Sequence, residues 1–215
     1  MKCMTLSNNG QECAAEFLEK IFNIFGEEHD LGNYFHQNID LILRNNLACA
    51  KCGELKQHIE YYKILPISLS SNDVTGKSIQ EVINGDFGNW NMSQDINCHS
   101  CSSLQKFYSS RTLDSTPKNI FLWLKRFEMG KKRCDKIHLQ TKIYMKMCSN
   151  ELKQYILKAI IVHRGSSLCS GHYICYIKNG FIWICCDDEK IKRIKYSMMK
   201  EDVEKNGYLF LFSRL

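Results

Sequence analysis

Apolar residues recur at helical spacing near the start of the chain. The residues with this spacing are Ala14, Phe17, Leu18, Ile21 and Phe25. The pattern predicts an amphipathic helix over 11–25, and Asn9 and Glu12 have the spacing of a capping box at its start. A less regular pattern predicts a second helical piece over 30–35.

The middle of the chain is more polar and less regular. The segment 56–71 is rich in β-forming residues and predicts extended structure. The segment 77–84 predicts a short helix, with Gly85 just past its end. The segment 86–95 contains Gly, Asn and Asp and predicts a loop.

From residue 119 onward the pattern is typical of β-strands. The apolar or β-rich runs are 120–124, 155–162, 172–178, 181–186 and 208–212. Asn179–Gly180 stands between two of these runs and is a strong hairpin signal. The sequence therefore predicts helix first and antiparallel sheet later, which is an α+β arrangement.

Composition limits the class of protein. The chain has 215 residues, of which 44% are apolar and 24% are charged, which suits one globular domain. No stretch of about 18 uncharged apolar residues exists, so we expect no membrane partner. The polar start lacks the apolar segment of a signal peptide, which predicts a location in the cytoplasm or nucleus.

The net charge of +6 is spread along the chain rather than gathered in one basic segment. We therefore expect a solvated surface and no nucleic-acid partner. The 12 cysteines, without a signal peptide, predict reduced thiols, some of them binding metal.

Four of the cysteines form two Cys-x-x-Cys pairs, Cys49 with Cys52 and Cys98 with Cys101. Two intervening residues let one tight turn aim both sulfurs at a single ion, and two such turns complete a tetrahedral thiolate site. The sequence predicts a structural Zn²⁺ site without an open position. The alternative is four unrelated thiols in a cysteine-rich chain.

A histidine and an aspartate are brought together by the predicted hairpin. With Asn179–Gly180 as its turn, Lys178 lies opposite Phe181 and His172 lies opposite Asp187. Facing residues of paired strands have side chains in contact. A carboxylate beside an imidazole fixes its tautomer and stabilises the imidazolium, as a general base requires.

Two other interpretations of these residues remain open at this point. His172 can be an ordinary strand histidine, with the following aspartates in a turn. His163 competes as the base because it ends an apolar run, but Asp187 and Asp188 lie closer to His172 in the predicted hairpin.

Five motifs in this order resemble the ubiquitin-specific protease family, the papain-like deubiquitinases. They are the helix 11–18, similar to Gln-x-Asp-Ala-x-Glu-Phe; the four cysteines; the strand 117–127, ending in Leu-Lys-Arg-Phe; the histidine box 155–173; and the closing strands 183–188 and 208–212. The resemblance covers nearly the whole chain.

The resemblance implies a papain-like fold with fingers, palm and thumb that grip ubiquitin. It implies His172 as general base, Asp187 as the residue that orients it, and Asp188 as an auxiliary carboxylate. The subdomains would be a thumb remnant over 1–46, zinc-binding fingers over 47–115 and a palm over 116–215. The expected partners are ubiquitin or ubiquitinated proteins.

The chain departs from the family's pattern in two places. No match to the cysteine box, Asn-x-Gly-Asn-x-Cys-x-x-Asn, precedes Gln11, so we expect these residues to be inactive as a peptidase. Cys13 occupies the family's Asp position. An incomplete thumb would expose apolar surface, so we also expect a protein partner that completes or stabilises it. The alternative function is a zinc-stabilised, ubiquitin-binding pseudo-enzyme or scaffold.

Overall fold

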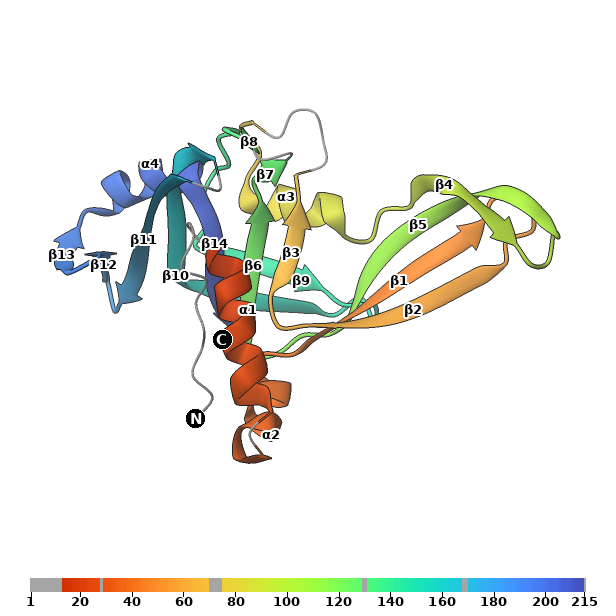
Figure 1. Ribbon diagram of the computed structural model, residues 1–215, viewed down its shortest axis with the longest axis horizontal. Helices are drawn as coiled ribbons and strands as arrows, with labels where there is room; N and C mark the ends of the chain where they lie inside the picture. Colours follow the sequence, from red (N-terminus) through yellow and green to blue (C-terminus); the bar gives the residue numbers. More distant parts are fainter. Residues whose placement is uncertain (1–12, 28, 70–74, 129–130, 168–169, 215) are drawn as a thin grey trace.

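The molecule consists of two β-sheets, one forming a broad body and the other a long arm that projects from it (Figure 1). The computed structural model describes residues 13–27, 29–69, 75–128, 131–167 and 170–214. We call the arm the fingers sheet and the body the palm sheet. The predicted order of helix first and antiparallel sheet later describes most of the chain.

Two helices open the described chain and pack together on one face of the palm sheet. They are α1, Ala14–Gly26, and α2, His29–Asn38, as the apolar spacing predicted. Ala15 and Phe22 of α1 are buried in a cluster with Tyr208 and Leu209 from the palm. The predicted capping box of Asn9 and Glu12 lies outside the described residues.

The fingers sheet has four antiparallel strands in the order β2-β1-β5-β4. They are β1, Leu41–Cys49; β2, Leu55–Tyr62; β4, Asn91–Cys98; and β5, Ser103–Ser115. The prediction of a loop over 86–95 was wrong for its second half, because Asn91 onward pairs with β5. Among the described residues, no helix covers the outer part of this arm (Figure 1), and its strands carry many polar residues.

The palm sheet has a main path in the order β13-β12-β11-β10-β14-β6-β3. Its strands are β3, Leu65–Ser68; β6, Asn119–Lys125; β10, Leu152–Ser167; β11, Ser170–Asn179; β12, Ile182–Asp187; β13, Lys190–Ile194; and β14, Gly207–Arg214. Three short strands lie off this path: β7, Phe127–Glu128; β8, Lys131–Lys132; and β9, Lys142–Lys146. The pair of β3 and β6 is parallel, and the other palm pairs are antiparallel.

Helix α3, Ile79–Asp86, begins with a complete capping box in which the Ser78 side chain and Glu81 satisfy each other's backbone N–H groups. Gly85 lies inside this helix, so the prediction that it follows the helix end was wrong. Both β3 and α3 pack with the palm core. The range 47–115 predicted for the fingers therefore contains one strand and one helix of the palm.

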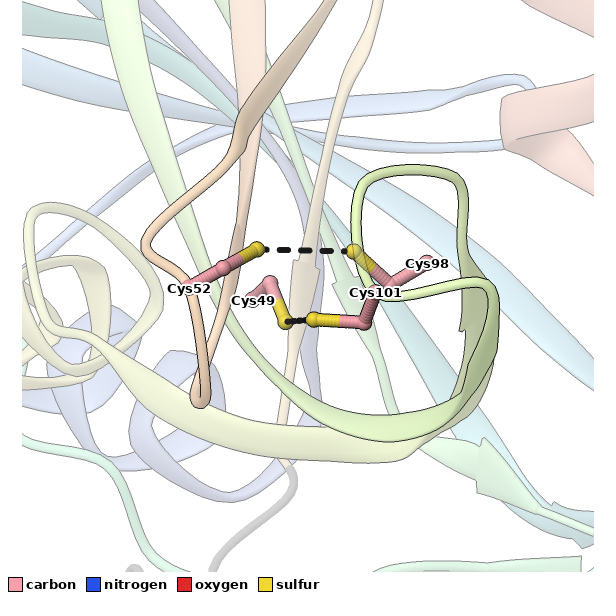
Figure 2. A group of neighbouring side chains, drawn as sticks. All are labelled: Cys49, Cys52, Cys98 and Cys101. Carbon is pink, nitrogen blue, oxygen red and sulfur yellow. Dashed lines mark hydrogen bonds between the residues drawn. The ribbon is translucent and has the colours of Figure 1, made fainter.

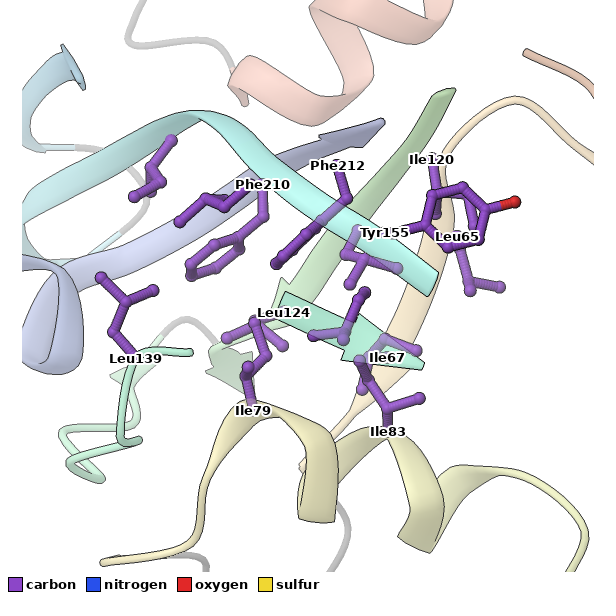
Figure 3. Packing of buried hydrophobic residues seen from close by; sticks show 14 of the residues in the cluster. Leu65, Ile67, Ile79, Ile83, Ile120, Leu124, Leu139, Tyr155, Phe210 and Phe212 are labelled. Carbon is purple, nitrogen blue, oxygen red and sulfur yellow. The ribbon is translucent and has the colours of Figure 1, made fainter. Parts of the chain in front are cut away.

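The main core lies between α3 and the palm sheet, where strands and helix contribute interlocking aliphatic and aromatic side chains (Figure 3). The side chains of Leu122, Leu124, Tyr155 and Phe212 are completely buried. Burial of this much apolar surface is the main favourable term in folding. The inner ends of β1 and β5 reach into this core through Leu41, Leu43 and Leu113.

Helix α4, Tyr196–Asn206, joins β13 to β14 and is anchored by the buried Arg126. The Arg126 guanidinium donates hydrogen bonds to the carbonyl oxygens of Gly207 at 2.7 Å, Asp135 at 2.8 Å and Glu204 at 3.3 Å. A buried arginine is tolerated where its N–H groups find acceptors. Among the described residues, no helix has the length and apolar character needed to cross a membrane.

Candidate active site and metal centre

The four cysteines of the two Cys-x-x-Cys pairs meet at the far end of the fingers (Figure 2). One pair lies in the turn from β1 to β2 and the other in the turn from β4 to β5. Their four sulfur atoms all lie within 4.8 Å of one another. The structure thus brings together the four residues that the sequence predicted as metal ligands.

The sulfur spacing suits a zinc ion. Cys52 Sγ lies 3.6 Å from Cys98 Sγ, and Cys49 Sγ lies 4.0 Å from Cys101 Sγ. A tetrahedral zinc with Zn–S bonds of about 2.3 Å needs sulfurs about 3.8 Å apart. His99 is exposed and is not part of the sulfur group. The four thiols could fill all four positions of a tetrahedral Zn²⁺, as in structural zinc sites.

The thiols of this cluster differ in acidity. Backbone N–H groups, that of Cys52 first, lower the pKa of Cys49 to about 7. The Cys98 thiol donates to the Glu54 carboxylate at 3.0 Å, which raises the pKa of Cys98 to about 12. Glu54 was not among the predicted site residues, although it follows Cys52 by only two residues.

The hairpin of β11 and β12 differs in register from the prediction. Its two-residue turn is Gly180 and Phe181, because Asn179 pairs with Ile182 and Cys175 pairs with Cys186. The predicted pairing of His172 directly opposite Asp187 was therefore wrong, by two residues. A shift of two leaves each side chain on the same face, so the two residues become diagonal neighbours.

His172 and Asp187 nevertheless make a short contact. His172 Nε2 lies 2.6 Å from Asp187 Oδ1, and the hydrogen bond lowers the pKa of the Asp187 carboxyl below its usual value. His172 Nε2 also lies 3.9 Å from Asp188 Oδ2, whose side chain is 79% exposed. With Nε2 held by Asp187, the other ring nitrogen of His172, Nδ1, is left for a reaction partner.

His163, the competing base, has a different environment. It is completely buried among Phe127, Tyr173 and Tyr208, and burial lowers its pKa. Neither of its ring nitrogens has a hydrogen-bond partner within the described residues. A histidine without a carboxylate partner or access to solvent is poorly placed to be a general base.

A polar network that the sequence did not predict lies next to His172 in the palm sheet. Arg164 is the direct partner of His172 across β10 and β11. Its guanidinium contacts Asp202 at 2.8 Å, and Asp202 also accepts from Tyr176 Oη at 2.6 Å and Asn206 Nδ2 at 2.8 Å. Asp202 lies 38 residues after Arg164, so no short-range pattern in the sequence links the two.

The remaining cysteines differ in burial. Cys185 is buried, Cys175 and Cys186 are half-buried, and Cys134 and Cys148 are exposed. Cys13 is the N-cap residue of α1, and its Sγ lies 2.9 Å from Tyr208 Oη. Cys3 and Cys169 lie outside the described residues.

Solved structures of the same fold come from a deubiquitinase module. The structure of the Ubp8, Sgf11, Sus1 and Sgf73 module of SAGA bound to monoubiquitin superposes with a TM-score of 0.80 at 24% identity, covering 96% of this chain and 49% of that chain. The module bound to ubiquitin aldehyde gives a TM-score of 0.80 at 21% identity, covering 96% and 50%. The predicted fold class, an α+β ubiquitin-specific protease domain with antiparallel palm and fingers, is confirmed.

The family itself follows from sequence. The family described as ubiquitin carboxyl-terminal hydrolase matches residues 2–212, so the chain belongs to that family. Ubiquitin carboxyl-terminal hydrolase 9 of Saccharomyces cerevisiae is 25% identical over 213 residues, covering 86% of this chain and 28% of the yeast protein. Ubiquitin carboxyl-terminal hydrolase 46 of Caenorhabditis elegans is 26% identical over 198 residues, covering 83% and 44%. The chain thus spans less than half the length of these relatives.

Proposed function

We propose that this chain is the fingers and palm of a deubiquitinase that cleaves after the C-terminal Gly of ubiquitin by thiol chemistry. His172 would be the general base, Asp187 would orient it, and Asp188 would be an auxiliary carboxylate. The observation that carries the proposal is the 2.6 Å contact between His172 Nε2 and Asp187 Oδ1. Membership of the hydrolase family supports it.

The proposed reaction is acyl transfer. His172 Nδ1 accepts the proton of a cysteine thiol, and the thiolate attacks the carbonyl carbon of the terminal Gly. His172 then gives the proton to the leaving amine, and water releases ubiquitin from the thioester. Asp187 holds the ring through Nε2 and stabilises the imidazolium formed in the first step.

The nucleophile is the part that these 215 residues do not supply. They contain no match to the family's cysteine box, and a triad without its nucleophile retains at most about 10³–10⁴-fold catalysis over water. We therefore expect the chain as given to be inactive. A longer chain or a partner that carries the box would complete the site.

The four-cysteine cluster would bind Zn²⁺ in a structural role. The thiols of Cys49, Cys52, Cys98 and Cys101 would complete its coordination shell, so the ion would order the fingers rather than take part in the reaction. The sulfur spacing supports this assignment.

Ubiquitin would contact an exposed apolar face of the fingers. Leu55, Tyr108 and Met92 lie in one row across the sheet, since Leu55 and Tyr108 both pair with Ala48 and Tyr108 pairs with Met92. Their exposed fractions are 52%, 40% and 65%. Apolar side chains gathered on a solvent-facing sheet indicate a protein-binding surface.

Reaction with a ubiquitin C-terminal electrophile, measured by intact mass, tests the chemistry. We expect no adduct on the chain as given, and an adduct on a form extended with a cysteine box. In that extended form, His172→Ala should abolish the adduct, whereas His58→Ala, on the exposed fingers strand, should leave it unchanged. An adduct on the given chain, lost in Cys13→Ser, would contradict the proposal.

Ubiquitin titration followed by NMR tests the binding surface separately. Tyr108→Asp should weaken binding at least ten-fold, because a charge would replace an apolar contact. Phe181→Asp is the control, since Phe181 is another exposed aromatic residue but lies at the β11–β12 turn in the palm. Equal loss in both variants would mean that the fingers face is not the contact.

The second candidate function is a non-catalytic, zinc-stabilised module that binds ubiquitin as a pseudo-enzyme or scaffold. Cys13 in the family's Asp position favours it. A protein partner would then complete or stabilise the thumb, as the partner subunits of the Ubp8 module suggest. Nucleic acid and membrane are not proposed as partners, and location in the cytoplasm or nucleus stays a prediction.

A further inference from the structure

Cys175 of β11 and Cys186 of β12 lie directly opposite each other, in a pair that neither the proposed chemistry nor the metal centre uses. They form the last paired position of this hairpin before His172 and Asp187. Directly opposed residues of antiparallel strands point to the same face of the sheet. The two thiols therefore lie side by side on the face of the sheet opposite to the side chains of His172 and Asp187, which are near them along the strands.

Both thiols are accessible. Cys175 and Cys186 are half-buried and line a shallow hollow of about 300 Å³, together with Ala14 and Phe17 of α1. The neighbouring Cys185 points to the opposite face, where it is buried in the palm core. A small oxidant can therefore reach Cys175 and Cys186 but not Cys185.

The backbone spacing of such a pair suits a disulfide. Directly opposed residues have Cα atoms about 4.5 or 5.5 Å apart, and disulfides join Cα atoms about 4.4–6.8 Å apart. Their Cβ atoms, about 4.5–5.5 Å apart in a sheet, must approach to about 3.5–4.5 Å. The bond would pull the two strands together, and the strain would make it easy to reduce.

We propose that Cys175 and Cys186 are a redox site that forms a reversible cross-strand disulfide with a peroxide as oxidant. In the first step one sulfur attacks a peroxide oxygen, the O–O bond breaks, and a sulfenic acid and one water form. In the second step the other sulfur attacks the sulfenic sulfur, the S–O bond breaks, and a second water leaves. Two thiols lose two electrons and two protons, and one hydrogen peroxide becomes two waters.

The environment of Cys175 affects its reactivity. Burial, with the neighbouring thiols adding to it, raises the pKa of Cys175 to about 11. Because the thiolate is the reactive form, this burial slows the reaction of Cys175 with peroxide.

The disulfide would change the candidate active site through the backbone. Asp187 follows Cys186 directly, and His172 lies three residues before Cys175. Closing the last pair of the hairpin moves Asp187 relative to the imidazole that it holds at 2.6 Å. This inference concerns thiol chemistry and does not depend on the proposed hydrolase activity.

Peroxide treatment of the zinc-saturated chain, followed by peptide mapping without reduction, tests the site. Trypsin and chymotrypsin together release Cys175 in 174–176 and Cys186 in 184–190. We expect these two peptides to be joined, with a loss of about 2 Da, and to separate again on reduction with dithiothreitol. The ring ¹⁵N signals of His172 should shift in the oxidised chain and return on reduction.

Matched variants identify the sulfurs. Cys185→Ala should keep the link, whereas Cys186→Ser should lose both the link and the His172 shift. The exposed Cys134 and Cys148 report within the same sample that oxidation has occurred. The site is refuted if they oxidise while 174–176 stays unlinked in the unsubstituted chain, or if Cys185→Ala removes the link.

Discussion

The palm and the fingers are both largely antiparallel, but they are stabilised in different ways. The palm buries a continuous cluster from its sheet and α3, with Leu122 and Phe212 completely buried. The inner ends of β1 and β5 contribute Leu41, Leu43 and Leu113 to that cluster, whereas the outer part of the fingers buries only the separate cluster of Cys49, Cys98 and Phe107 among the described residues, and two of these are candidate metal ligands. The palm relies on apolar burial, whereas the outer fingers would rely on the proposed Zn²⁺ bound by the four cysteines.

The difference explains how one chain can combine a rigid site with an extended arm. Strands that project into solvent on both faces cannot bury enough apolar surface to offset the entropy of ordering them. The proposed structural ion would supply that stabilisation at one point. The arm can then present exposed side chains such as Tyr108 without a supporting layer.

Removal of zinc should give the largest effect and confine it to the fingers. Zinc in small metal-ordered domains contributes about 10–16 kcal/mol of apparent binding free energy, so a chelator or Cys98→Ser should unfold the outer ends of β1, β2, β4 and β5. Hydrogen exchange followed by mass spectrometry should show lost protection there and unchanged protection in β10. Cys134→Ser is the exposed-cysteine control. Equal loss in β10 would mean that the two regions are not independent.

Truncation of a palm side chain should give the next largest effect, and it should be independent of zinc. Phe212→Ala should cost about 3–5 kcal/mol of unfolding free energy, because it opens a cavity in a fully packed cluster. Leu104→Ala, at a position 60% exposed on the fingers, should change it by less than about 0.5 kcal/mol. Urea denaturation with and without zinc measures the unfolding free energy of both variants. A comparable loss in the two variants would contradict the difference between palm and fingers.

Within the palm, the buried His163 should give a smaller, pH-dependent effect. Burial lowers its folded pKa, so below the unfolded value of about 6.5 the unfolded chain binds a proton that the folded chain does not. Stability should therefore fall as pH falls below about 6.5, by at most about 1.4 kcal/mol per pH unit.

Urea denaturation of His163→Phe between pH 7 and pH 5 measures this contribution. In His163→Phe, the free energy of unfolding should depend less on pH, because the contribution of His163 is lost. In His58→Gln, at an exposed position, the pH dependence should be unchanged. An unchanged slope in His163→Phe would mean that His163 is already protonated in the folded chain.

The parts of the fold that burial dictates could be predicted from the sequence. Helix α1 and strands β6, β10 and β14 have one or two buried faces, so their apolar spacing reports their structure. Strands β4 and β5 could not be found in this way. Asn91, Asp95 and Asn97 of β4 are exposed. The buried positions of β5, Phe107, Ser110 and Leu113, recur every three residues instead of every two, so neither strand shows the alternation that a half-buried strand predicts.

The metal centre could be predicted better than the geometry of the candidate active site. Each Cys-x-x-Cys turn is a short-range pattern, and it indicates metal binding whatever the number of residues between the two turns. The contact of His172 with Asp187 depended on a register, and Asn179–Gly180 did not identify the turn that the chain adopts. The contacts of Arg164 with Asp202 depend on how α4 packs, which no local pattern encodes.

The two-residue difference in the hairpin also bears on which insertions and deletions the protein can tolerate. If the hairpin keeps a two-residue turn, inserting two residues after Gly180 moves the pairing along the strands but keeps Asp187 on the same side of the sheet as His172. Inserting one residue with the same turn length moves the Asp187 side chain to the opposite side. Among natural variants of this hairpin, changes in length by even numbers should therefore be the ones that retain the histidine–aspartate pair.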